Sequence, residues 1–242
     1  MTIAILYQDD FLVAVDKPAG MLVIPGRGAV EQTVQQELQE TFGRIWVVHR
    51  LDRGTSGVLV FGRTAEAHRD LNIAFEHHQI HKQYLALVRG HFPEVEHIDV
   101  PIAPARRGRM RPARPDDPKG KVAATRVRRL ALLQLAPEVM GRAGSAGSID
   151  ASLVEAVPET GRTHQIRVHL VHAGYPLLFD PDYGAREPLR GASGEVVLER
   201  TPLHASRIEL PLPRGGSRVI EAPLPPDMEQ VLALGRGDAK VV

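Results

Sequence analysis

The chain has 242 residues, a formal net charge of +1 and no cysteine, so it can bury a sizeable core in one or two domains. The lack of cysteine excludes disulfides, thiolate chemistry and cysteine-ligated zinc. No apolar run is long enough for a membrane span, and the N-terminus lacks the basic flank and apolar core of a signal peptide, so we expect a cytoplasmic protein with no membrane partner.

The first elements along the chain are short strands and one helix. Short β-type runs at 3–7 and 11–16 surround an Asp-Asp turn, and apolar runs at 45–48 and 58–61 predict two buried strands. Between them, the segment 31–42 has apolar residues at helical spacing and ends at a glycine, which predicts a helix.

The second half of the chain predicts further strands with few helices. The predicted elements are, in order, a helix capped by Thr64, a strand at 83–88, an extended loop at 104–121, a strand at 122–135, a flexible turn at 140–148, a strand at 151–157, a helix at 163–173, a short helix capped by Asp227 and a frayed tail at 236–242. No βαβ repeat is present. The pattern indicates an α+β fold with a mixed, largely antiparallel sheet.

The turn between the two central buried strands has the strongest chemical signal. Asp52 lies between Arg50 and Arg53 in a turn rich in Gly, Thr and Ser. A carboxylate that is held by rigid strands beside basic groups stays ionised and can act as a nucleophile. The structural alternative is a loop aspartate that only caps its own turn.

A second signal is a local excess of positive charge between residues 106 and 129. The ten basic residues there are Arg106, Arg107, Arg109, Arg111, Arg114, Lys119, Lys121, Arg126, Arg128 and Arg129, and only Asp116 and Asp117 oppose them. Such a segment is suited to phosphate groups. Its alternative is a solvated, partly disordered loop.

Several segments resemble one known family. His49-Arg50-Leu51-Asp52 followed by Thr55-Ser56-Gly57 resembles the catalytic motif of the RluA-type pseudouridine synthases, which convert uridine in RNA to its C-glycoside isomer. Further segments that resemble the family, in the family's order, are 5–10 through 17–20, 82–84, 160–169, 180–184 and 203–205. The resemblance runs over roughly 5–210, while residues 104–150 match nothing closely.

The resemblance implies the pseudouridine-synthase fold, which is a bent, mixed, mostly antiparallel sheet with flanking helices and a central RNA-binding cleft. It implies one catalytic domain over 1–235 with a basic loop insertion at 104–129. We expect no N-terminal S4-type domain, because catalytic-domain sequence begins at Ile3. The expected enzyme is a monomer that uses no cofactor and no metal.

The same resemblance gives roles to four residues. Asp52 is the catalytic acid, Tyr84 packs against the target uracil and is a candidate for removing the C5 proton, Arg167 pairs with Asp52, and Arg50 fills the space that the flipped base leaves. A strand tyrosine is otherwise most often a half-buried packing residue. The residues do not choose among addition of Asp52 to the sugar, addition to the base and a glycal route.

The predicted helix at 163–173 has polar residues at its start. His164 and Arg167 are three residues apart on one face, and Arg167 is offset from the apolar stripe of Ile166 and Leu170, so it can face the cleft wall. Arg162 is suited to a phosphate or to the neighbouring loop. We expect Arg162, His164, Arg106, Arg107, Arg109 and Arg111 to bind RNA. The alternative is a solvated helical face.

Three functions compete for these residues. The first is an RNA pseudouridine synthase acting on ribosomal RNA, a tRNA stem-loop or both, and the second is an RNA-binding or remodelling protein of the same fold without turnover. The presence of Asp52, Tyr84 and Arg167 favours the first. A hydrolase using Asp52 and a histidine is weaker, since no serine elbow or carboxylate pair supports it. His77 and His81 are four residues apart but have no partner at a recognised metal-site spacing.

Overall fold

The computed structural model describes residues 3–26, 31–136, 149–191, 193–212 and 215–235. The chain divides into two compact units. Unit 1 comprises residues 1–83 and 204–223, and unit 2 comprises 84–203 and 224–242. Two strands, β5 (His81–Arg89) and β13 (Leu203–Pro211), contain boundaries between the units. The predicted flexible turn at 140–148 and the predicted frayed tail at 236–242 lie outside the described residues.

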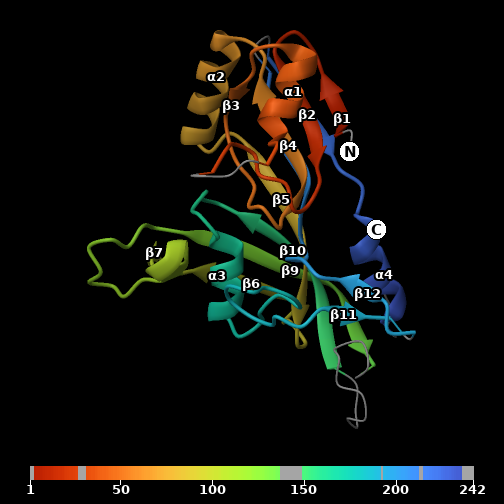
Figure 1. Cartoon of the computed structure of the whole chain (residues 1–242). Coiled ribbons are helices and arrows are strands. Elements are labelled where there is room, and N and C mark those ends of the chain that lie inside the picture. The colour runs from red at the N-terminus through yellow and green to blue at the C-terminus, as the bar shows by residue number, and fades with distance from the viewer. Residues whose placement is uncertain (1–2, 27–30, 137–148, 192, 213–214, 236–242) are drawn as a thin grey trace. The chain divides into compact units, whose positions relative to one another are not determined.

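Unit 1 combines a small sheet with two helices (Figure 1). Besides its parts of β5 and β13, it contains β1 (Ala4–Gln8), β2 (Leu12–Lys17), α1 (Val34–Phe42), β3 (Trp46–Val47), β4 (Ser56–Gly62), α2 (Ala65–Glu76) and β14 (Ser217–Glu221). Strand β2 pairs antiparallel with β1 and β4, β3 pairs antiparallel with β4, and β13 pairs parallel with β4 and antiparallel with β14. The central strand β4 is buried along its whole length.

The structure confirms the predicted caps, Gly43 at the end of α1 and Thr64 at the start of α2, and adds a capping box that was not predicted. Thr33 and Gln36 form a capping box at the start of α1, which ends at Gly43 in a backbone conformation with φ 68°. Thr64 caps α2 by accepting the N–H of Ala67 at 3.0 Å. Helix α2 then packs its inner face into one hydrophobic core with residues of β2, β4, β13 and β14.

Unit 2 is built mainly of antiparallel strands. It contains the rest of β5, β6 (Val95–Asp99), β7 (Ile102–Pro104), the 3₁₀ turn η1 (Arg106–Gly108), β8 (Met110–Pro112), β9 (Ala124–Leu135), β10 (Ile149–Pro158), α3 (Gln165–His172), β11 (Leu189–Arg190), β12 (Val196–Leu198) and α4 (Pro226–Leu234). Strand β10 pairs antiparallel with β5 and β9, and β6 pairs antiparallel with β9. The few helices and the mostly antiparallel pairing in both units confirm the predicted α+β class.

The segment 104–121 differs from the predicted extended loop. Strands β7 and β8 pair antiparallel, and η1 reverses the chain between them with Arg107 at φ 57° and Gly108 at φ 73°. Two backbone hydrogen bonds between Ile102 and Lys121, each 2.9 Å, close the base of the segment. We call residues 102–121 the basic arm; it extends away from β9 and β10 in Figure 1. Its strands are too short and proline-rich for sequence periodicity to reveal them.

Two helices also differ in detail from the prediction. Helix α4 has Pro225 at its N-cap, so Asp227 is not the cap but lies in the first turn, where it pairs with Arg200. Helix α3 is buried on nearly all sides, because it packs against β8, β9 and β10. The expected one-sided apolar stripe is therefore incomplete. No helix in the described parts of the chain is long and apolar enough to cross a membrane.

Candidate active site

The turn that carries Asp52 lies between β3 and β4 of unit 1. The carbonyl of Asp52 accepts the N–H of Thr55 at 3.1 Å, which closes the turn. Beside it, Arg53 exchanges two hydrogen bonds with the backbone of Gly20, at 2.7 and 2.8 Å, and pairs with Glu31 at 2.9 Å. The Asp52 side chain is half-buried. The loop after β2 therefore holds the turn in place.

A fully buried lysine holds the same two segments from inside. Lys17 is 0% exposed, and its ammonium donates to the carbonyl oxygens of Pro18 at 2.8 Å, Arg53 at 3.3 Å and Thr55 at 2.8 Å. A buried cation is costly unless its donors are satisfied. Since the acceptors come from both segments, Lys17 fixes the backbone on the C-terminal side of Asp52.

The small residues after Asp52 are explained by close packing against β13. Gly57 adopts φ 109°, and a Cβ there would lie 2.2 Å from the carbonyl oxygen of Ala205, so only glycine fits. Next to it, the buried Ser56 hydroxyl lies 2.9 Å from Nδ1 of the buried His204, whose Nε2 is 3.4 Å from the carbonyl oxygen of Ala222. The motif 55–57 and the segment 203–205 thus form one structural unit.

On the other side of Asp52, His49 is a neutral structural group. Its Nε2 accepts the N–H of Val60 in β4 at 3.0 Å, and its ring lies 5.0 Å from that of Phe75 in α2. Burial, with a smaller contribution from the charge of Lys82, lowers the pKa of His49 to about 3. Burial also lowers the pKa of Lys82, whose ammonium lies 5.7 Å from the Phe75 ring. His49 therefore anchors the entry to the Asp52 turn.

We expect His49 to make the folded state sensitive to acid. The unfolded chain binds a proton on His49 below about pH 6.5, whereas the folded chain binds it only near pH 3. Protons therefore favour the unfolded state in this window, and stability falls as the pH falls, with a slope of up to about 1.4 kcal/mol per pH unit from this group.

The measurement is urea unfolding of wild type and the His49→Gln variant between pH 7 and pH 4. Glutamine keeps a hydrogen-bond acceptor for Val60 but does not titrate, so the variant should show a shallower pH dependence. The exposed His77→Gln variant is the matched control and should follow wild type. Equal slopes for wild type and His49→Gln would show that His49 is not held neutral in the folded chain.

In unit 2, the start of α3 is fixed by a buried glutamine. The Gln165 amide oxygen accepts from the Thr160 hydroxyl at 2.6 Å and from the Arg162 N–H at 3.0 Å, while its NH₂ donates to the carbonyl oxygen of Ala124 and the hydroxyl of Thr125. The turn before α3 is thereby tied to β9. His164 stands at the N-cap with left-handed φ 55°, so it is not a helical neighbour of Arg167 as expected.

Arg167 is buried in α3 and bound by two carboxylates of its own unit. Its Nε and one Nη donate to the two carboxylate oxygens of Asp180 at 2.8 and 2.7 Å, and the same Nη lies 2.8 Å from an oxygen of Asp182. The Arg167 and Asp180 side chains are 6% and 1% exposed. This bidentate geometry fixes the plane of the guanidinium. The sequence resemblance implied only Asp52 as its partner.

The other predicted site residues have different surroundings. Tyr84 is buried in β5, opposite Ala156 of β10. Arg50 is exposed beside the Asp52 turn. Arg162 is exposed, and its Nε donates to the carbonyl oxygen of Val122 at 3.0 Å. The sequence offered a phosphate or the neighbouring loop as its partner, and this hydrogen bond is the contact to the loop.

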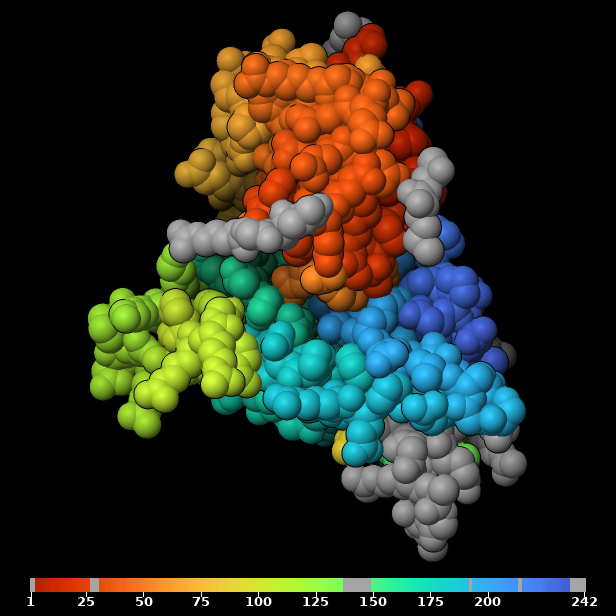
Figure 2. Space-filling view, viewed as in Figure 1, coloured from red at the N-terminus to blue at the C-terminus, as the bar shows by residue number. Residues whose placement is uncertain are grey.

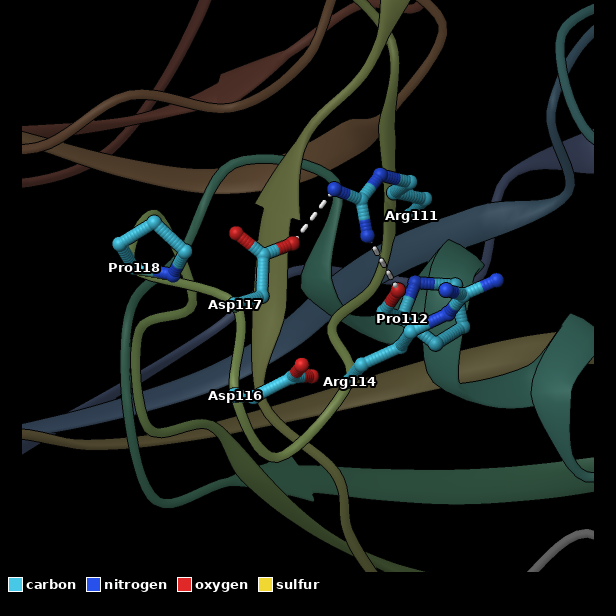
Figure 3. A pocket seen from close by; sticks show the side chains of 6 residues that line it. All are labelled: Arg111, Pro112, Arg114, Asp116, Asp117 and Pro118. Atoms are coloured by element: carbon cyan, nitrogen blue, oxygen red, sulfur yellow. Dashed lines mark hydrogen bonds and ion pairs between the residues drawn. The ribbon is translucent and has the colours of Figure 1, made fainter.

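The basic arm presents arginines of two kinds. Arg109 donates to the carbonyl oxygen of Asp182 at 3.1 Å, and Arg111 pairs with Asp117. Arg106 and Arg107 are exposed and have no ion pair among the described residues. An open pocket of about 680 Å³ lies on the arm (Figure 3), lined by Arg111, Pro112, Arg114, Asp116, Asp117 and Pro118. In the space-filling view the arm forms a yellow-green protrusion of unit 2 (Figure 2).

The C-terminal part of the predicted basic segment is a strand, not a loop. Arg126 and Arg128 project from β9, where they lie 3.6 Å from Glu159 and 3.1 Å from Glu155. Arg129 binds the carbonyl oxygen of Phe92. The positive charge of this part is therefore largely neutralised, and the excess is concentrated in the basic arm.

Comparisons with known proteins agree with this fold and motif arrangement. A family model described as RNA pseudouridylate synthase matches residues 11–172. The chain is 38% identical over 235 residues to tRNA pseudouridine synthase C of Salmonella typhi, which covers 94% of this chain and 88% of that protein. It is 35% identical over 237 residues to ribosomal large subunit pseudouridine synthase D of Zymomonas mobilis, covering 93% of this chain and 70% of that protein.

A solved structure of a protein with a pseudouridylate synthase domain has a similar fold. Human RNA Pseudouridylate Synthase Domain Containing 1 superposes with a TM-score of 0.74 and 25% identity, covering 97% of this chain and 88% of that chain. The fold and the match define an RNA-modifying isomerase. The chain belongs to the RluA-type RNA pseudouridine synthases, which confirms the family indicated by the motif around Asp52. It isomerises uridine in RNA.

Three residues that organise the site were not predicted from the sequence. Lys17 and Asp180 lie in segments that resemble the family, but nothing local shows that they are buried. Tyr183 lies in the same segment as Asp180, and its hydrogen bond to the basic arm spans 73 residues. A local signal that could have been used is that Lys17 ends β2, a strand that begins with four apolar residues.

Proposed function

We propose that this enzyme isomerises specific uridines in structured ribosomal or transfer RNA, with Asp52 as the catalytic carboxylate. The observation that carries the proposal is the rigid turn around Asp52, which a buried lysine and a half-buried histidine hold from both sides. According to their names, the two relatives above act on transfer RNA and on the large ribosomal subunit. We further propose that the enzyme acts as a cytoplasmic monomer.

The proposed reaction consists of a few bond changes, and a small number of side chains assist them. The bond from the ribose C1′ to N1 of uracil breaks, the base turns, C1′ bonds to C5, and the C5 proton is lost while N1 gains one. A carboxylate supports the cleavage as a nucleophile or by stabilising positive charge on the sugar. In this proposal Tyr84 packs against the uracil and takes part in proton removal, Arg167 holds the catalytic acid, and Arg50 fills the space that the flipped base leaves.

We propose that the basic arm binds RNA phosphates outside the reacting nucleotide. Arg106 and Arg107 are exposed in the η1 turn of the arm, so their guanidinium groups are available to an incoming backbone. Replacing both by alanine should weaken RNA binding and flatten its dependence on salt, by roughly 0.7–0.9 in the log–log slope for each phosphate that the variant no longer neutralises. A salt titration of RNA binding measures this.

The matched control is the double variant Arg126→Ala and Arg128→Ala. It removes the same charge from the same unit, but from arginines that already pair with glutamates. If the slope falls equally in both double variants, only the total charge matters and the arm is not a specific binding element. An unchanged slope for the arm variant would remove the arm from the binding surface.

The experiment that tests the function is pseudouridine mapping of total RNA from cells with and without this gene. We expect one or a few ribosomal or transfer RNA positions to lose the modification. Return of those positions with wild type but not with an Asp52→Asn gene supports catalysis by Asp52. Full return with the Asp52→Asn gene would contradict catalysis by Asp52. It would favour the alternative function, an RNA-binding or remodelling protein without turnover.

A further inference from the structure

The loop between α3 and β11 is locked onto Arg167. One oxygen of Asp180 accepts the N–H groups of Asp182 at 3.0 Å and Tyr183 at 3.2 Å, while both oxygens bind the Arg167 guanidinium. All these residues lie in unit 2. A shift of this loop would therefore change the support of Arg167.

The same loop also anchors the β7–β8 hairpin of the basic arm, next to its η1 turn. The Tyr183 hydroxyl accepts the N–H of Met110 in β8 at 2.7 Å, and the carbonyl oxygen of Asp182 accepts from Arg109 at 3.1 Å. The side chains of Met110 and Tyr183 pack against one small core of Ile102, Ala123 and Val168. Arm and α3 thus share a hydrophobic contact as well as polar ones.

Tyr183 has two separable functional parts. Its ring face lies 4.8 Å from the guanidinium carbon of Arg167, a cation–π contact, and its hydroxyl lies 2.7 Å from Nδ1 of His164. A phenol oxygen can accept one hydrogen bond and donate another at the same time, so it can serve Met110 and His164 together. The ring contacts the arginine, and the hydroxyl contacts the arm and the α3 N-cap.

We propose that Tyr183 is a positioning residue that couples the RNA-binding arm to Arg167. The hydroxyl bond to Met110 holds the β7–β8 hairpin of the arm where it meets RNA, and the ring holds the guanidinium of Arg167. This inference rests on the proposed roles of the arm and of Arg167. It predicts different kinetic effects for loss of the hydroxyl and loss of the ring.

The test compares Tyr183→Phe and Tyr183→Leu in steady-state turnover of the RNA identified by mapping. Phenylalanine keeps the ring but cannot accept the Met110 N–H, so KM should rise about tenfold while kcat stays within about twofold of wild type. Leucine has neither the ring nor the hydroxyl, so kcat should also fall by about tenfold or more. Tyr175→Phe removes a hydroxyl elsewhere in unit 2, where Tyr175 packs on Phe92, and should leave both constants unchanged.

A combination with the arm variant isolates the coupling. If the hydroxyl acts through the arm, Tyr183→Phe should add little to the KM of the Arg106→Ala and Arg107→Ala variant. Full additivity of the two KM effects would overturn the proposal, as would equal kcat losses for phenylalanine and leucine or no effect of either. Since the additivity comparison does not use the leucine variant, it stands even if that variant does not fold.

Failure of this proposal is distinct from failure of the proposed function. An arm variant with wild-type KM would remove the arm from RNA binding, which contradicts the proposed role of the arm but leaves catalysis by Asp52 to the mapping experiment. A weakened arm variant beside a Tyr183→Phe variant with wild-type KM would leave the arm in place and contradict only the role of Tyr183. Thermal unfolding midpoints of all variants, measured in parallel, exclude a general loss of fold.

Discussion

We expect the Asp52→Asn variant to fold and to bind RNA like wild type while its turnover falls by several orders of magnitude. Asparagine keeps the size of the side chain and the backbone carbonyl that accepts the Thr55 N–H, and the turn keeps its hydrogen bonds to Lys17. It cannot supply a negative charge or a strong nucleophile for cleavage of the glycosidic bond. Single-turnover isomerisation of the mapped RNA measures the effect.

The matched control for this variant is Asp10→Asn. Asp10 is an exposed aspartate in the turn between β1 and β2 of the same unit, so the chemical change is identical but lies on the surface. It should retain wild-type turnover. Activity of Asp52→Asn within about tenfold of wild type, on the same RNA, would refute the assignment of Asp52 as the catalytic acid.

Arg167→Met should destabilise unit 2 strongly. The substitution removes the bidentate partner of Asp180, whose side chain is 1% exposed, and leaves a buried carboxylate with two backbone N–H donors among the described residues. Breaking a buried pair by removing one partner typically costs about 3–5 kcal/mol. Urea unfolding measures the loss. The exposed Arg186→Met variant removes an arginine from the same loop region and should stay within about 0.5 kcal/mol of wild type.

The double variant Arg167→Met and Asp180→Asn tests the cause of that loss. Because the neutral amide costs less to bury than an unpaired carboxylate, the double variant should recover part of the stability. Simple additivity of the two single losses would mean that the pair contributes no interaction free energy. Combining Arg167→Met with Asp52→Asn in the same way measures the Asp52–Arg167 pair, which stays a prediction of the sequence.

The sequence predicted local elements better than it predicted their environment. Caps such as Thr64 and Gly43 act on the nearest turn of backbone, so their residue types alone locate the start of α2 and the end of α1. The basic arm was missed as a hairpin because three-residue strands carry too few side chains for a period of two. Burial of α3 on nearly all sides was missed because it depends on neighbours that are distant in sequence.

The sequence by itself determined the α+β class, the family and the acid in its basic turn, because each depends on the types and spacing of residues that are close along the chain. Only the tertiary structure decided which groups support that chemistry. Ser56 meets His204 across 148 residues, Arg167 meets Asp180 across 13, and Met110 meets Tyr183 across 73. Such contacts depend on strand register and loop closure, which local patterns leave open.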